Sequence, residues 1–247
     1  MEVSPAPSPS LPPPEEKAAW VRSMFDRIAP RYDRFNDLLS AGVHRLWRRR
    51  AVAALAPRGG ERHIDLCAGT MDLSRMISDR APGARVVAAD FALRMLAGGR
   101  EKAAAAPGPL WPVAGDALRL PFADASFHGC IVGFGLRNLA DYGRGLSEMR
   151  RVLAPGGRLV VLEFTTPPGG FFRAVYHTYF HHVLPRVGAA ISGDPAASRY
   201  LPESVKAFPD VGSLAALLRS EGFHRVRHVY LTGGIAAIHH AVRGSRA

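Results

Sequence analysis

Apolar residues recur at helical spacing along the first part of the chain. Four of them predict one face of a helix: Trp20, Met24, Phe25 and Ile28. Pro30 interrupts this pattern, and a second helical segment ends near Gly42. A third covers residues 44–55, with basic residues outward and apolar residues inward. We therefore expect residues 15–55 to form an N-terminal helical cap.

Short apolar runs then alternate with helical stretches. The runs that predict strands are 61–69, 85–91, 110–116, 126–134 and 157–164. The helical stretches between them are 72–80, 93–105 and 141–153. This alternation is typical of an α/β protein with a parallel, doubly wound sheet.

The pattern changes again after Phe164. Residues 165–210 are irregular and are expected to form an insertion over the ligand, with five aromatic residues at Phe171, Phe172, Tyr176, Tyr179 and Phe180. A helix is predicted over 213–223, and the runs 224–231 and 235–243 predict an antiparallel C-terminal hairpin. The expected seven-stranded sheet with this hairpin points away from a plain dehydrogenase.

The start of the chain has a different composition. Residues 1–14 are rich in proline and predict a disordered tail, so residues 15–247 are expected to form a single domain. The start lacks the basic and apolar regions of a secretory signal. No apolar run reaches the roughly 18 residues that span a bilayer.

Composition and charge limit the class of protein. The 247 residues are 47% hydrophobic and 21% charged, which is typical of a globular chain. The net charge is +11, and only Lys17, Lys102 and Lys206 are lysines. Such a charge favours nucleic acid or an acidic membrane surface, although arginine enrichment is also a genomic bias. Two cysteines, Cys67 and Cys130, exclude a disulfide framework and fit a reducing, cytoplasmic compartment.

Polar residues follow the first three predicted strands, at the sheet edge where doubly wound folds bind their ligands. The candidate donor-binding residues there are Asp65, Gly69, Thr70, Asp72, Asp90, Asp116 and Ala117. Asp90 is placed to hold two ribose hydroxyls, and Asp116 to accept from an adenine amino group.

The same segment distinguishes between nucleotide ligands. The dinucleotide fingerprint G-x-G-x-x-G is absent, because Ala68 and Met71 occupy glycine-type positions. Asp65 and Asp72 would repel a pyrophosphate and attract the sulfonium or ammonium group of S-adenosylmethionine. The residues therefore favour this methyl donor over NAD. The alternative is that Asp72 caps a helix and Asp65 is a structural carboxylate.

Three further segments carry longer signatures. They are Tyr32-Asp33-x-x-Asn36-x-x-Leu39-Ser40-x-x-x-His44-x-x-Trp47, then Gly133-Phe134-Gly135-Leu136-Arg137-Asn138, then residues 151–165. Together with residues 200–205 and the terminal hairpin, they resemble the ubiquinone/menaquinone biosynthesis C-methyltransferases over about residues 17–243.

The resemblance implies a class I, Rossmann-like methyltransferase that uses S-adenosylmethionine to methylate a ring carbon of a polyprenylated quinol. It leaves open whether the acceptor is a naphthoquinol, a benzoquinol or both. The donor contacts that it implies are Thr70, Asp90, Asp116, Ala117 and Gly133. Phe35, Ala154 and Thr165 are mild departures from the family pattern. Ala68 and Met71 replace glycines, and methionine is costly if φ is positive there.

Ring methylation requires an electron-rich carbon, so the acceptor must be the reduced quinol. Arg137 and Asn138 follow the fourth strand and are expected to face it. Arg137 is expected to stabilise a phenolate or, alternatively, to form a structural ion pair with Glu163 or Asp141.

Candidates for moving the phenolic proton are Tyr32, Asp33 and His177. Local turn packing and capping are the alternative for the first two. His177, His181 and His182 lack a third-ligand motif, so no metal is expected.

Two surface features bear on the partner. Residues 171–180 are expected to cover an isoprenoid chain, and the run 48–50 is either a solvated helix face or a contact with anionic lipid. With a lipid acceptor and no spanning segment, we predict peripheral membrane association.

Two other function classes stay open. The charge suits a nucleic-acid methyltransferase, but Gly-Phe-Gly-Leu-Arg-Asn stands where amino-methylating enzymes of that class carry Asp/Asn-Pro-Pro-Tyr, so no nucleic-acid partner is expected. Met71 keeps a non-catalytic donor-binding subunit open. Titration with the donor, followed by an assay on demethylmenaquinol, separates the three.

Overall fold

The computed structural model describes residues 11–170, 173, 178 and 195–244. The strands of its sheet are β1 (Arg62–Leu66), β2 (Arg85–Asp90), β3 (Leu110–Ala114), β4 (Phe127–Gly133), β5 (Leu153–Phe164), β6 (Phe223–Leu231) and β7 (Ala236–Arg243). They form one 7-stranded sheet in the order β3-β2-β1-β4-β5-β7-β6. β1 to β5 are parallel, and β7 is antiparallel to both β5 and β6. The predicted α/β sheet with a C-terminal hairpin is confirmed.

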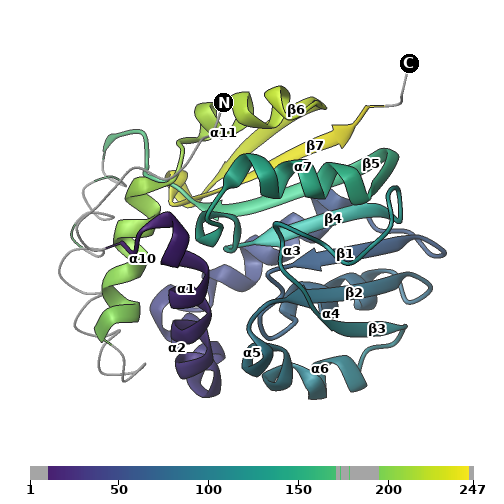
Figure 1. Ribbon diagram of the computed structural model, residues 1–247, viewed down its shortest axis with the longest axis horizontal. Coiled ribbons are helices and arrows are strands. Elements are labelled where there is room, and N and C mark those ends of the chain that lie inside the picture. Colours follow the sequence, from purple (N-terminus) through teal and green to yellow (C-terminus); the bar gives the residue numbers. More distant parts are fainter. Residues whose placement is uncertain (1–10, 171–172, 174–177, 179–194, 245–247) are drawn as a thin grey trace.

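Helices cover both faces of this sheet (Figure 1). α7 (Tyr142–Val152) and α11 (Val211–Ser220) lie on one face, and α3 (Val43–Leu55) and α4 (Asp72–Arg80) lie on the other. In β4, both faces of the strand are buried from solvent. Cys130 and Val132 face α7, while Ile131 faces α3. Alternate side chains of a strand point to opposite faces, so a strand covered twice is apolar throughout.

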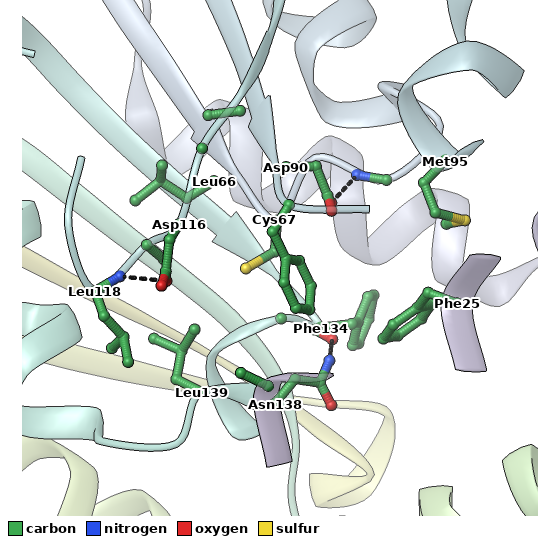
Figure 2. Close-up of a pocket in the computed structure, with 18 of the residues that line it drawn as sticks. Phe25, Leu66, Cys67, Asp90, Met95, Asp116, Leu118, Phe134, Asn138 and Leu139 are labelled. Carbon is green, nitrogen blue, oxygen red and sulfur yellow. Dashed lines mark hydrogen bonds between the residues drawn. The ribbon is translucent and has the colours of Figure 1, made fainter. Parts of the chain in front are cut away.

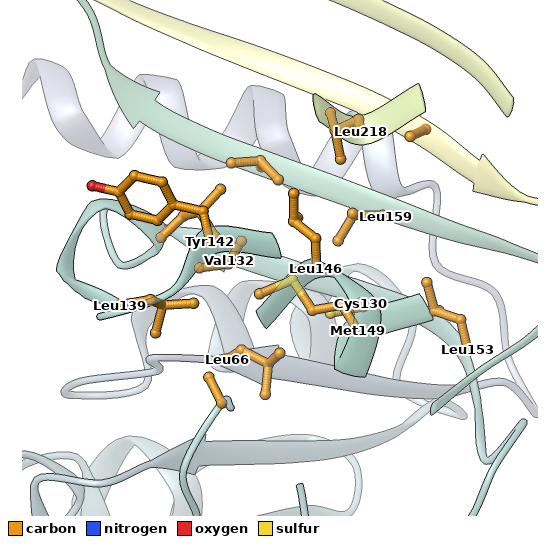
Figure 3. Close-up of a cluster of buried hydrophobic side chains, with 14 of the residues drawn as sticks. Leu66, Cys130, Val132, Leu139, Tyr142, Leu146, Met149, Leu153, Leu159 and Leu218 are labelled. Atoms are coloured by element: carbon orange, nitrogen blue, oxygen red, sulfur yellow. The ribbon is translucent and has the colours of Figure 1, made fainter. Parts of the chain in front are cut away.

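The α7 face holds the larger apolar cluster (Figure 3). Leu146 and Met149 of α7 are 0% exposed and pack with Val132 and Leu159 of the neighbouring strands. Each fully buried side chain of this size stabilises the fold by roughly 1.5–3 kcal/mol. This packing fixes β4 and β5, whose carboxyl ends carry the residues discussed below.

Further helices gather at one end of the sheet, at the left of Figure 1. They are α1 (Pro14–Ile28), the short helix η1 (Ala29–Arg31), α2 (Tyr32–Ser40) and α10 (Pro195–Ala207). Val21, Met24, Ile28 and Tyr200 form a buried apolar cluster between α1 and α10. α3 packs on the sheet through its apolar stripe, so the expected 15–55 cap is in fact α1, η1 and α2.

Three elements differ from the expectation. The predicted helix 93–105 is divided into α5 (Leu93–Gly98) and α6 (Arg100–Ala104), and a Cβ on Gly99 would lie 2.7 Å from the Thr70 carbonyl oxygen. α10 occupies a stretch that was expected to be irregular, because the packing of Tyr200 outweighs the effect of Pro202 within the helix. β5 begins at Leu153, earlier than expected.

Several predictions fall on residues that the structure does not describe. Residues 1–10 of the predicted tail are among them, as are the five aromatic residues of the 171–180 stretch and His177. Within the described ranges, no helix is long and apolar enough to span a bilayer.

Candidate active site

The strand order reverses between β1 and β4, which is where parallel sheets open a crevice. The loops that follow these two strands touch, since a Cβ on Gly135 would lie 2.4 Å from the Cβ of Cys67. The β1 turn is tightly wound, with left-handed φ values of 54° at Cys67, 55° at Gly69 and 64° at Met71. Strained backbone of this kind clusters at functional sites.

A pocket of about 720 Å³ lies at this crevice, and we call it the strand-end pocket. It brings together five of the predicted donor-binding residues: Gly69, Asp90, Asp116, Ala117 and Gly133. Figure 2 shows the side chains of Asp90, Asp116, Phe134 and Asn138 around this space. Residues from four separate parts of the chain therefore meet at the carboxyl ends of β1 to β4.

Backbone groups orient both acidic side chains of this pocket. Asp90 accepts hydrogen bonds from the backbone nitrogens of Gly69 and Ala92, both at 2.8 Å, and Asp116 accepts from that of Leu118 at 2.9 Å (Figure 2). Burial raises the pKa of Asp90, although the backbone donors oppose the shift. Carboxylate oxygens have several acceptor positions, so both can still accept from a ligand.

Three predicted donor residues do not line this pocket. Asp65 is 1% exposed and accepts from the backbone nitrogen of Ser74 at 2.9 Å and from its hydroxyl at 2.6 Å. Asp65 thus accepts from a backbone nitrogen in the first turn of α4, so it is the structural carboxylate that the sequence offered as the alternative. Burial raises the pKa of Asp65 to about 7. Asp72 and Thr70 do not line the pocket either and take part in a charge network instead. The structure therefore does not place Asp65 and Asp72 where the predicted attraction for the sulfonium would act.

The network joins the helical cap to the β1 turn. Lys102 lies 2.6 Å from Asp33 and 2.6 Å from Asp72, and Asp72 lies 2.7 Å from Arg48. Thr70 donates its hydroxyl proton to Asp33 at 2.6 Å. Asp33 therefore holds α2 to the turn and lines neither pocket, contrary to its predicted role in proton transfer.

Arg48 is buried at 7% exposure, so the run 48–50 is not a uniformly solvated face. Its guanidinium donates to Nδ1 of His44 at 3.1 Å, and Nε2 of His44 therefore carries the proton and donates to Asp37 at 2.9 Å. Burial, followed by the Arg48 charge, lowers the pKa of His44 to about 4. Arg49 and Arg50 remain exposed.

A second pocket, of about 1380 Å³, lies under the helical cap, and we call it the cap pocket. Its walls are mainly apolar residues of α1, α2 and α3, together with Arg48 and Arg137. Phe25, Tyr32 and Phe134 line both pockets, so the two spaces meet at these three rings. Phe134 has a left-handed φ of 59°, and its ring lies 4.6 Å from that of Phe164.

Arg137 and Asn138 lie in the short helix η2 (Leu136–Asn138), which follows β4. Arg137 lines the cap pocket and forms a buried ion pair with Glu163 at 3.0 Å, one of the two alternatives that the sequence left open. Asn138 lines the strand-end pocket and accepts from the hydroxyl of Tyr200 at 3.1 Å.

The departures from the family pattern have defined environments. Met71 adopts the left-handed backbone conformation that is costly for a residue with a side chain. Its side chain is 0% exposed, packs with Ala88 and Leu96, and lines neither pocket. A Cβ on Gly133 would lie 2.5 Å from Cδ1 of Leu73, so a larger residue here requires the Leu73 side chain to move.

The sequence did not identify Lys17, Lys102, Tyr200 or Phe134 as individual site residues. The available signal was composition, because lysine is rare in this arginine-rich chain. Among the described residues, no cluster of three or more histidine, cysteine, aspartate or glutamate residues could hold a metal ion.

Comparisons with known proteins place this geometry in a family. The model of the ubiE/COQ5 methyltransferase family matches residues 14–243. A demethylmenaquinone methyltransferase of Thermus thermophilus is 53% identical over 87% of this chain and 98% of its own. The ubiquinone/menaquinone biosynthesis C-methyltransferase UbiE of Paracoccus denitrificans is 44% identical over 91% of each chain.

The fold is also that of known methyltransferases. The crystal structure of an S-adenosylmethionine-dependent methyltransferase of Thermotoga maritima, a possible histamine N-methyltransferase, matches with a TM-score of 0.64 and 19% identity. The match covers 90% of this chain and 98% of that one. At this identity the likeness concerns the class I fold alone. The family-model match and the sequence identities show that this chain belongs to the ubiE/COQ5 methyltransferase family.

Proposed function

We propose that this protein transfers a methyl group from S-adenosylmethionine to a ring carbon of a prenylated quinol in menaquinone biosynthesis, ubiquinone biosynthesis or both. The observation that carries the proposal is the junction of the two pockets at Phe25, Tyr32 and Phe134. A methyl donor in one pocket and an aromatic acceptor in the other would meet there. Such positioning supplies much of the rate of a two-substrate reaction.

The strand-end pocket fits the donor. Asp90 and Asp116 are held by backbone donors at places that suit the ribose and the adenine. Gly135, which has no Cβ, lets the loop after β4 pack against Cys67 at the same pocket. When bound, S-adenosylmethionine supplies an electrophilic methyl group on a sulfonium. Aromatic faces attract such a cation, so the rings at the junction take the role that the sequence assigned to Asp65 and Asp72.

The cap pocket fits the acceptor. Apolar walls suit a quinol ring with its isoprenoid chain, and Arg137 and Arg48 place positive charge at the edge of this space. Such charge would stabilise the phenolate that develops as the ring carbon attacks. Tyr32 lines both pockets and is the remaining described candidate for relaying the phenolic proton.

The test is an assay with methyl-deuterated donor and short-chain demethylmenaquinol, kept reduced under argon. Mass spectrometry should find one labelled methyl group on the ring of the quinol and none when the acceptor is kept as the quinone. A parallel reaction with a prenylated benzoquinol that carries hydrogen at the target ring carbon decides the acceptor class. Donor binding without product from either quinol would favour the non-catalytic alternative, and label in added RNA would favour the nucleic-acid alternative.

We also propose that the corner between α2 and α3 contacts an anionic bilayer. Leu38 is 62% exposed and Leu46 is 49% exposed, on either side of a segment whose residues 39–41 and 43 line the cap pocket. Arg45, Arg49 and Arg50 are exposed nearby. An apolar tip within a basic surface suits insertion among acidic headgroups, and it would bring the cap pocket to the membrane that holds a prenylated acceptor.

A further inference from the structure

Lysine is rare in this protein and is not randomly placed. Of the 32 basic residues three are lysines, which leaves 32 − 3 = 29 arginines. Lys206 is exposed on α10, whereas Lys17 and Lys102 both join the helical cap to the rest of the domain. A compact ammonium is thus found at two of the places where a charged group joins the cap to the rest of the domain.

The environment of Lys17 is unusual for a charged side chain. It is 2% exposed, and its ammonium donates to the backbone carbonyls of Arg137 at 2.9 Å and Leu139 at 2.7 Å. The ring centroid of Tyr142 lies 5.3 Å away, and no carboxylate of the described residues pairs with it. Burial, followed by the Arg137 charge, lowers the pKa of Lys17 to about 8. Its partners are backbone carbonyls around the end of η2, and that of Arg137 also accepts from the Tyr142 hydroxyl at 3.4 Å.

The helix that carries Lys17 forms a wall of both pockets. Ala18 and Phe25 of α1 line the strand-end pocket, and Met24, Phe25 and Ile28 line the cap pocket. Lys17 lies one residue before this wall begins. Its two hydrogen bonds therefore hold the wall against the loop that carries Arg137 and Asn138.

We propose that Lys17 is a positioning residue that fastens α1 as a cover over the strand-end pocket and sets the place of the Arg137–Leu139 loop. This proposal rests on the proposed function, since it assigns the cover to the donor-bound state. Release of the demethylated donor then requires α1 to leave the loop. A lysine suits this role better than an arginine, because a point charge with three donors fits between two carbonyls where a planar guanidinium does not.

The test compares Lys17→Met with Lys206→Met, which makes the same chemical change on an exposed lysine. S-adenosylhomocysteine is bound to each protein, and its release is followed by stopped-flow displacement. We expect Lys17→Met to release it at least tenfold faster than the parent, while Lys206→Met stays within twofold. A folded Lys17→Met variant with the parent's release rate would overturn the proposal.

Trp20 gives a second readout that needs no donor. It lies on α1 with its ring 5.0 Å from that of Tyr200, so its emission should shift to longer wavelength when α1 leaves α10. We expect this shift in Lys17→Met, and its loss in a Trp20→Phe background. A parent that does not bind S-adenosylhomocysteine would contradict the proposed function, and the Trp20 signal would still decide whether Lys17 fastens α1.

Lys17→Arg keeps the test decisive if Lys17→Met does not fold. It retains the positive charge, so its Tm should stay within about 3 °C of the parent. Its release rate should nevertheless rise threefold or more, because the guanidinium cannot reproduce both hydrogen bonds. Unchanged release in Lys17→Arg would show that any cation at this position suffices, and would overturn the positioning role.

Discussion

The guanidinium of Arg137 lies 3.0 Å from the carboxylate of Glu163, and both side chains are buried, at 7% and 3% exposure. Arg137 also lines the cap pocket. The ion pair that the sequence offered as one alternative is present, and Arg137 is also placed for the proposed contact with the acceptor. A buried ion pair and a charge at the acceptor need not compete, since the pair holds the guanidinium in place.

The double variant separates these roles. Arg137→Gln leaves Glu163 buried without its partner, which should cost about 3–5 kcal/mol of unfolding free energy. Arg137→Gln combined with Glu163→Gln should regain most of that stability. Turnover should stay reduced by about 100- to 1000-fold in both, because the positive charge at the phenolate is lost. Thermal melting and methyl-transfer rates check this, and recovered turnover in the double variant would show that Arg137 acts only on stability.

Asp90 should govern donor affinity. Asp90→Ala removes acceptors for the ribose and for the backbone nitrogens of Gly69 and Ala92. The loss of about 2–4 kcal/mol predicts donor binding weaker by roughly 30- to 1000-fold, with a lower Tm. Asp79→Ala, on the exposed side of α4, is the control for titration calorimetry. Equal donor affinity in the two variants would remove Asp90 from the donor site.

Met71 should affect stability and leave donor binding intact. Met71→Gly relieves a left-handed φ but removes a fully buried side chain, which usually costs about 2–5 kcal/mol. Donor affinity should stay within threefold of the parent, because Met71 does not line the strand-end pocket. Met71→Ala keeps a Cβ in the left-handed region and should be less stable than Met71→Gly by about 1 kcal/mol. The reverse order in chemical denaturation would mean that the turn is not strained at this residue.

His44 should make stability depend on pH. Burial holds its pKa at about 4 in the folded protein, below the usual 6.5, so the unfolded chain binds the proton more readily. The stabilising difference is present above pH 6.5 and is lost as the pH falls toward 4. His44→Gln should lose less Tm than the parent between pH 7 and pH 5. Parallel Tm curves for the two proteins would contradict this origin of the dependence.

Membrane binding should need both charge and the exposed leucines. The protein should float with phosphatidylglycerol vesicles at low salt and less so at high salt, since each arginine near an anionic surface contributes about 1 kcal/mol. Leu38→Ser combined with Leu46→Ser should reduce flotation without a change in Tm, because both side chains are exposed. Val229→Ser, an exposed residue on β6, is the control. Full flotation of the double variant would place the contact elsewhere.

Periodicity and strand ends were enough to predict the sheet and most of its ligand-binding edge. A strand that is buried on both faces is apolar throughout, so each strand can be recognised from its own short stretch of sequence. The same logic placed Asp90 and Asp116 at this edge, because the carboxyl ends of parallel strands meet there, whereas Gly133 came from the family resemblance.

Only the tertiary structure decided which polar group meets which. Asp65 and Asp72 look equivalent in sequence, yet their partners differ. Asp65 accepts a hydrogen bond from Ser74, whereas Asp72 forms ion pairs with Arg48 and Lys102. The hydrogen bonds of Lys17 reach residues 120 and 122 positions away, and α10 is held by packing that outweighs its proline. Local propensity carries no information about such distant partners, and a buried charge is satisfied by whichever group the packing brings within reach.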